Sequence, residues 1–181
     1  MPYLKISCLL LFATFLAACD DHVHHEPIIE RPTIYSWEVV DSFGHSNVGY
    51  SHNGHGEYSR SLLVDHTIDR GYFELFWDVE SYDDYSATIY INDYPGLIGA
   101  YQLDSTYCGH GLSCDNEGFA YCEYYSGSHD EISCSASSHT EPFVDVTNLF
   151  THHPSELYLI LEACNSYSGY CTSETQKVAF D

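Results

Sequence analysis

Apolar and polar residues alternate with a period of two along several short segments of the chain. Tyr35, Trp37 and Val39 alternate with polar neighbours, and the segment Phe73–Glu80 repeats the pattern with large apolar side chains. This period is typical of strands that bury one face. Residues 157–161 are apolar on both faces, which predicts a central strand covered on both sides.

Strand-like segments cover most of the chain after about residue 33, and none after residue 20 has a helical period. The predicted strands begin with a segment from about Thr33 and continue with Phe73–Glu80, Ala87–Asn92, Leu97–Leu103, Phe119–Tyr124, Glu131–Ala136, Phe143–Thr147, Leu157–Cys164 and Cys171–Phe180. About nine short strands separated by turn residues predict an all-β fold, a β-sandwich for which a jelly roll is one candidate topology. The glycine-rich segment Asp41–Ser61 is expected to be a mobile surface loop.

The first residues differ from the rest of the chain. Lys5 is followed by a mostly apolar stretch from Ile6 to Leu16, and Asp20 and Asp21 end the apolar region. A basic start, an apolar run of this length and small residues at its end are typical of a secretory signal and too short for a membrane span. We therefore predict a signal peptide over residues 1–18.

The end of this signal, Leu16-Ala17-Ala18-Cys19, resembles the lipobox of bacterial lipoproteins. The resemblance implies cleavage before Cys19, diacylglycerol on its thiol and a fatty acyl chain on its new amine. Residues 19–32 would then be the lipidated cysteine and a tether, and residues 33–181 a single domain in the cell envelope, facing the periplasm or the exterior. Inner and outer membrane both stay open, and the alternative is an ordinary signal with a chance cysteine.

Six cysteines remain beyond the signal and lipobox, and an even number in an exported protein indicates disulfides. A hairpin about Ser128 places Cys122 opposite Cys134 with one consistently apolar face, which fixes a register. Sequential pairing is the expectation, with bonds Cys108–Cys114, Cys122–Cys134 and Cys164–Cys171. In the hairpin closed by Cys164 and Cys171, direct pairing would place leucines opposite polar residues. A bulge or a shifted register is therefore expected in this hairpin. A zinc site is the alternative, but no CxxC pair occurs.

The charge of the chain excludes one class of partner. Its 27 acidic and five basic residues give a formal net charge of -22. Nucleic-acid binding needs clustered basic side chains that neutralise phosphate, so no nucleic-acid partner is expected. Because 44% of the residues are hydrophobic and 15% aromatic, we expect a folded acidic domain rather than a disordered one.

Two groups of side chains are candidate metal ligands. His45, His52 and His55 lie with Glu57 in the glycine-rich segment and could bind zinc or copper; the alternative is a set of solvated loop histidines. Calcium is the candidate for the carboxylates, which could also serve glycoside hydrolysis or simply form a solvated acidic surface. These carboxylates are Asp78, Glu80, Asp83, Asp84 and Asp93.

Tyrosines cluster around two predicted hairpins. One cluster contains Tyr82, Tyr85, Tyr90 and Tyr94, and the other contains Tyr121, Tyr124 and Tyr125. Exposed tyrosines recognise partners through a rigid ring with a polar tip, so the first cluster is the candidate binding face for protein or glycan. The alternative is that tyrosine simply suits half-buried strands.

The segment Phe143–Phe150 and the strand after it are loosely similar to the late strands of carbohydrate-binding jelly-roll modules, a resemblance that concerns the fold alone. The chain contains no GxSxG, HExxH, P-loop or dinucleotide motif, which favours a protein without catalytic activity. The predicted function is thus a membrane-anchored binding or structural module that uses a tyrosine-rich face. Metal binding by the His-rich loop is the alternative, followed by a glycan hydrolase.

Overall fold

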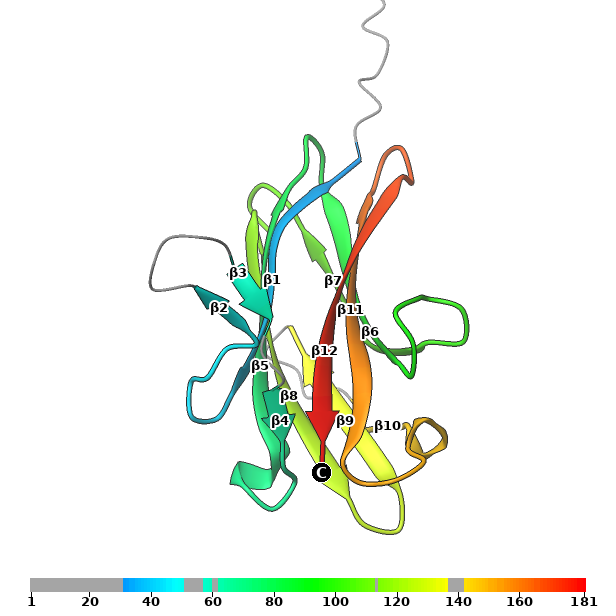
Figure 1. The fold of residues 1–181 in the computed structure, drawn as a ribbon. Helices are drawn as coiled ribbons and strands as arrows, with labels where there is room; N and C mark the ends of the chain where they lie inside the picture. Colours follow the sequence, from blue (N-terminus) through cyan, green and yellow to red (C-terminus); the bar gives the residue numbers. More distant parts are fainter. Residues whose placement is uncertain (1–30, 51–56, 60–61, 113, 137–141) are drawn as a thin grey trace, which may run out of the picture.

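Two five-stranded sheets face each other and form the β-sandwich that the alternating pattern predicts (Figure 1). The computed structural model describes residues 31–181 except 51–56, 60–61, 113 and 137–141. The first sheet has the order β1-β5-β8-β9-β10, and its strands are β1 (Thr33–Asp41), β5 (Tyr72–Glu80), β8 (Glu117–Ser126), β9 (Asp130–Ser135) and β10 (Val144–Asp145). The second sheet has the order β4-β12-β11-β6-β7, and its strands are β4 (Leu62–Val64), β12 (Cys171–Phe180), β11 (Ser155–Asn165), β6 (Tyr85–Asn92) and β7 (Tyr101–Cys108).

The core lies between the sheets because every second side chain of the long strands points inward. In β8, buried and exposed residues alternate along nearly the whole strand. Leu159 and Ile160 point to opposite faces of the central strand β11 and both are buried, which confirms the prediction of a central, covered strand, although Tyr158 is only half-buried. The indole nitrogen of Trp37 in β1 donates a hydrogen bond to the carbonyl of Leu159 at 3.3 Å, so the two sheets are also joined by a polar contact.

Three connections meet at one end of the sandwich, here named the loop end. Residues 81–84 carry the chain from β5 to β6, and residues 109–116 carry it back from β7 to β8. Residues 166–170 join β11 to β12 at the same end. Strand β1 also begins there, since Thr33 is paired with Glu80, whereas the C-terminus lies at the opposite end (Figure 1).

The structure corrects two of the predicted strands. The strand expected over Leu97–Leu103 is instead β7, which begins at Tyr101, because the side-chain amide of Asn92 donates to the carbonyls of Gly96 and Ile98 and holds the preceding residues in a loop. The strand expected over Phe143–Thr147 is reduced to Val144–Asp145. Here the carboxylate of Asp145 accepts the backbone N–H of Thr147 and turns the chain into a short 3-10 helix.

The expectation of one loop over Asp41–Ser61 is wrong in part. Residues Val48–Tyr50 (β2) and Glu57–Ser59 (β3) pair as a small antiparallel sheet. The three short strands β2, β3 and β4 are too brief to show an alternating pattern, which is why the structure has more strands than the sequence predicted. Among the described residues, no helix is long and apolar enough to span a bilayer.

The three predicted disulfides are confirmed. Cys108 is bonded to Cys114, Cys122 to Cys134 and Cys164 to Cys171. The register of the β8–β9 hairpin is also as predicted, with Cys122 directly opposite Cys134.

The irregular register expected for the last hairpin is wrong. Strands β11 and β12 pair without a shift, so Leu159 faces Gln176 and Leu161 faces Glu174. Gln176 is tolerated opposite an apolar residue because its amide is satisfied. Its nitrogen donates to the carbonyl of Trp37 at 2.8 Å, and its oxygen accepts from the Asn47 side chain at 2.7 Å.

Candidate binding site at the loop end

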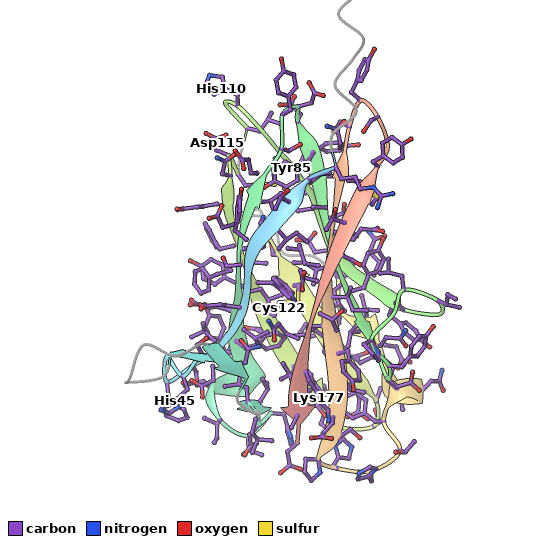
Figure 2. All side chains as sticks on the ribbon, turned by 45° about the horizontal axis from the view of Figure 1, so that its top comes forward. His45, Tyr85, His110, Asp115, Cys122 and Lys177 are labelled. Carbon is purple, nitrogen blue, oxygen red and sulfur yellow. A yellow bond between two sulfur atoms is a disulfide. The ribbon has the colours of Figure 1, made fainter. Side chains whose placement is uncertain are left out.

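A pocket of about 510 Å³ lies between the three connections of the loop end. Its lining residues come from three regions distant in sequence and are mostly tyrosine, aspartate, serine and asparagine: Ser81, Tyr82, Asp83, Asp84, Tyr85, Gly109, His110, Asp115, Asn116, Ser166 and Tyr167. Figure 2 shows Tyr85, His110 and Asp115 together at this end, away from His45 and Lys177. The volume falls in the range of small-molecule sites.

Disulfides fix two of the three connections at their bases. Cys108–Cys114 closes the connection between β7 and β8, and Cys164–Cys171 closes the β11–β12 hairpin. The backbone N–H of Ser166 donates to the carbonyl of Asp84 at 2.8 Å, which ties the third connection to the hairpin. The pocket is therefore largely preformed, and ligand binding would order little additional chain.

Gly109 brings the connections still closer together. Its φ is +145°, and a Cβ at this position would lie 2.1 Å from the Asp84 carboxylate oxygen and 3.0 Å from its Cα. Only glycine combines this backbone conformation with this approach. Gly109 thus lets the 109–116 connection pack directly against the 81–84 connection.

Tyr85 forms the floor of the pocket. Its ring is buried, and its hydroxyl donates to the carbonyl of Asp115 at 3.0 Å. Burial is the main cause that raises the pKa of Tyr85 to about 12. Tyr85 therefore stays a neutral phenol that links β6 to the start of β8.

The rim of the pocket carries two exposed rings. Tyr82 and Tyr167 are 72% and 75% exposed, and they come from different connections. Asp83 accepts a weak hydrogen bond from the Asn165 amide at 3.4 Å, and the same Asn165 accepts the backbone N–H of Tyr167 at 2.9 Å. The rim thus combines aromatic surface with carboxylate acceptors on a fixed backbone.

The four tyrosines predicted as a binding face do not lie together. Tyr82 and Tyr85 line the pocket. Tyr90 is half-buried, and its hydroxyl lies 3.3 Å from the Glu162 carboxylate, where burial raises its pKa. Tyr94 lies beyond the far end of β6, and its hydroxyl donates to the carbonyl of Ile98.

The five predicted calcium ligands are also dispersed. Asp83 and Asp84 line the pocket, whereas Asp93 follows the far end of β6. Asp78 is opposite Glu117 on the outer face of the first sheet. Glu80 accepts a hydrogen bond from the Tyr35 hydroxyl at 2.5 Å.

One group in the described part of the chain brings three ligand atoms within 4.8 Å of one another, namely Glu162, Cys164 and Cys171. Its two cysteines form a disulfide and so offer no thiolate.

The predicted histidine site falls largely outside the described residues. His52 and His55 are not described, and for Glu57 only the backbone is. His45 lies in the turn after β1, where its Nδ1 is 3.0 Å from the Asp41 carboxylate. The signal, Cys19 and the tether before residue 31 also lie outside the described residues, so these predictions stay predictions.

Sequence analysis did not identify the pocket residues His110, Asp115, Asn116 and Tyr167. These residues lie between two paired cysteines or just after a paired cysteine. This position could have indicated them from the sequence, since a loop closed by a disulfide presents its side chains to solvent. What the sequence lacked was the sheet order, which brings residues 81–85, 109–116 and 166–167 to one end. No family model, curated protein or solved structure matches the chain, so its function has to be inferred from this site.

Proposed function

We propose that this protein is a lipid-anchored binding module of the bacterial cell envelope, which recognises a glycan with the loop-end pocket. The observation that carries the proposal is the pocket itself, with two exposed tyrosine rings over a preformed cavity of about 510 Å³. Binding pockets of this size usually combine aromatic surface with a few placed polar groups.

Sugar chemistry accounts for the residue types present. The C–H face of a pyranose ring packs against an aromatic ring, a role open to Tyr82 and Tyr167. Sugar hydroxyls donate hydrogen bonds, and Asp83, Asp84 and Asp115 supply acceptors around the same pocket. Tyrosine, serine, asparagine and glycine on loops of a β-sandwich also form the recognition surfaces of antibodies.

The envelope location rests on two separate observations. Three disulfides are typical of a protein outside the cytoplasm. The lipid anchor is supported by the lipobox-like segment ending in Cys19. Growth of a bacterial host with a labelled fatty acid tests the anchor: the protein should take up label, and Cys19→Ser should take up none. Label retained by Cys19→Ser would contradict the assignment.

Glycan recognition is tested on an array of immobilised neutral and acidic oligosaccharides, followed by titration of any saccharide retained. Tyr82→Ala and Tyr167→Ala should each weaken binding about tenfold, since a lost aromatic contact is worth about 1 kcal/mol or more. Tyr94→Ala is the matched control, because it removes an exposed tyrosine far from the pocket and should change the affinity little.

Two results would overturn glycan binding at this site. One is an array without a retained saccharide, and the other is affinity that survives both pocket variants. The same samples are examined for shortened products, because paired carboxylates can hydrolyse glycosidic bonds. Cleavage that is lost in Asp83→Asn, Asp84→Asn or Asp115→Asn would replace the binding module with a glycan hydrolase.

A further inference from the structure

The outer face of the first sheet carries a group of outward-pointing aromatic rings, here named the aromatic face. It consists of the outward-pointing aromatic residues of β5 and β8: Tyr72, Phe76, Phe119, Tyr121 and Tyr125. Phe76 is 39% exposed, Phe119 46%, Tyr121 49% and Tyr125 56%. An exposed cluster of large apolar side chains on a soluble domain usually marks an interaction site.

The register of the sheet brings three of these rings into contact and sets a fourth opposite one of them. Phe76 is directly opposite Phe119. The rings of Tyr72 and Tyr121 are stacked, with centroids 6.0 Å apart, and the ring of Phe119 meets that of Tyr121 edge-on at 5.2 Å. The rings of Tyr72, Phe119 and Tyr121 therefore pack together, and Tyr72 and Tyr121 each cover part of one face of the other ring.

Carboxylates are interleaved with these rings. Cross-strand pairing sets an acidic residue opposite an aromatic one in four pairs: Glu74 with Tyr121, Glu123 with Tyr72, Glu38 with Phe76, and Glu131 with Tyr125. Directly paired residues lie on the same face of a sheet. The Tyr72 hydroxyl donates to the Glu74 carboxylate at 2.7 Å, which orders that part of the face.

Among the residues that the structure describes, positive charge borders the face at one margin. Arg70 lines a groove of about 300 Å³ with Glu123, Tyr125, Phe143 and His66. The other described basic residues are engaged elsewhere: Lys177 pairs with Glu156 at 2.6 Å, and Arg31 lies over the Tyr170 ring. The centre of the face, around Phe119 and Tyr121, is thus aromatic and acidic.

We propose that the aromatic face docks an arginine-rich, basic segment of a partner protein. A guanidinium group packs over aromatic rings and also pairs with carboxylates in a fork geometry, so it uses both components of this face. A second copy would bring the same carboxylates against one another in a chain of net charge -22. A neutral sugar has no positive charge to pair with the carboxylates that lie among these rings, whereas a guanidinium group does.

The test uses a fluorescently labelled peptide of alternating arginine and serine at about physiological salt, where distant surface charges are screened. The wild-type protein should bind it, and the double variant Phe119→Thr/Tyr121→Thr should bind about tenfold more weakly, the loss expected when two cation–ring contacts are removed. Threonine suits an exposed strand position, so the sheet should be kept. The double variant Glu74→Gln/Glu123→Gln keeps the rings and should show a similar loss.

The charge-matched control is Asp93→Asn/Glu174→Gln, which removes one exposed carboxylate just after β6 and one in β12 and should alter the affinity less than about twofold. Equal weakening by this control would overturn the proposal, because it would reveal attraction to the whole acidic domain. No binding of the peptide would overturn it as well, as would a dimer that Phe119→Thr/Tyr121→Thr abolishes. The pocket variant Tyr167→Ala should leave peptide binding unchanged, so this test and the glycan test fail independently.

Discussion

Asn47 is a fully buried polar residue that joins strands β1 and β12. Its side-chain oxygen accepts the backbone N–H of Val39 at 2.8 Å, and its nitrogen donates to the Gln176 side chain at 2.7 Å. Gln176 in turn donates to the carbonyl of Trp37. Buried amides are costly unless they are satisfied, so these bonds explain how polar residues fit where β1 of one sheet meets β12 of the other.

Gly71 is a second residue whose identity is set by its surroundings. Its φ is +65°, and a Cβ built there would lie 2.2 Å from the backbone oxygen of Tyr124. Gly44 has a similar φ of +78° but nothing within 4 Å of the same position. Comparing alanine substitutions at the two glycines therefore separates the free-energy cost of the left-handed backbone from the cost of a steric clash.

Gly71→Ala should destabilise the protein far more than Gly44→Ala. The left-handed conformation alone should cost about 1–2 kcal/mol in either variant. The clash with the Tyr124 backbone should bring the total for Gly71→Ala to about 3 kcal/mol or more. Urea unfolding at neutral pH measures both values, and equal losses in the two variants would show that the approach to Tyr124 is unimportant.

At the scale of elements, the sequence predicted the long strands because their alternation is set by burial alone. Strands β5, β8, β11 and β12 lie within a few residues of the expected bounds. Strand β7 begins later than the sequence predicted, because hydrogen bonds from the Asn92 side chain hold the preceding residues in a loop. Such side-chain hydrogen bonds produce no periodic pattern in the sequence.

The disulfides were predictable because each pair closes a short hairpin or loop. Cys122 and Cys134 share an apolar face with Tyr124 and Ile132, so a single register satisfies all four residues. The candidate pocket was not predictable in the same way. Tyr82 and Tyr167 are 85 positions apart, and they meet only because β6 and β11 are neighbours in the second sheet.

On the scale of the whole molecule, several tyrosines are held protonated by the fold. Burial is the main cause that raises the pKa values of Tyr72, Tyr85 and Tyr124, and for Tyr85 the value is about 12. In the unfolded chain a tyrosine ionises near pH 10. At a pH between the unfolded-state pKa and the folded-state pKa, the folded protein binds more protons than the unfolded chain. The free energy of unfolding must therefore fall as the pH rises through this range.

We therefore expect the contribution of these tyrosines to the free energy of unfolding to be unchanged between about pH 7 and pH 9 and to fall from about pH 10 toward pH 12, by up to about 1.4 kcal/mol per pH unit for Tyr85. Tyr85→Phe removes one ionisable phenol and should make this decline shallower, although its stability at neutral pH should also be lower because a hydrogen bond is lost. Urea unfolding at a series of pH values gives both quantities. A decline with the same slope in the wild type and in Tyr85→Phe would contradict the role of this tyrosine.

The order of the disulfides has a consequence for how the domain matures. Each bond joins a cysteine to the next one of the six along the chain, at sequence separations of 6, 12 and 7 residues. In the proposed export of the chain from its N-terminus, Cys108 would meet Cys114 before Cys122 emerged, and each later pair would be completed in the same order. Short loops also close at the lowest entropic cost. We therefore expect that an oxidase acting on consecutive thiols is sufficient for native pairing, and that removal of a disulfide isomerase leaves the yield of correctly paired protein unchanged.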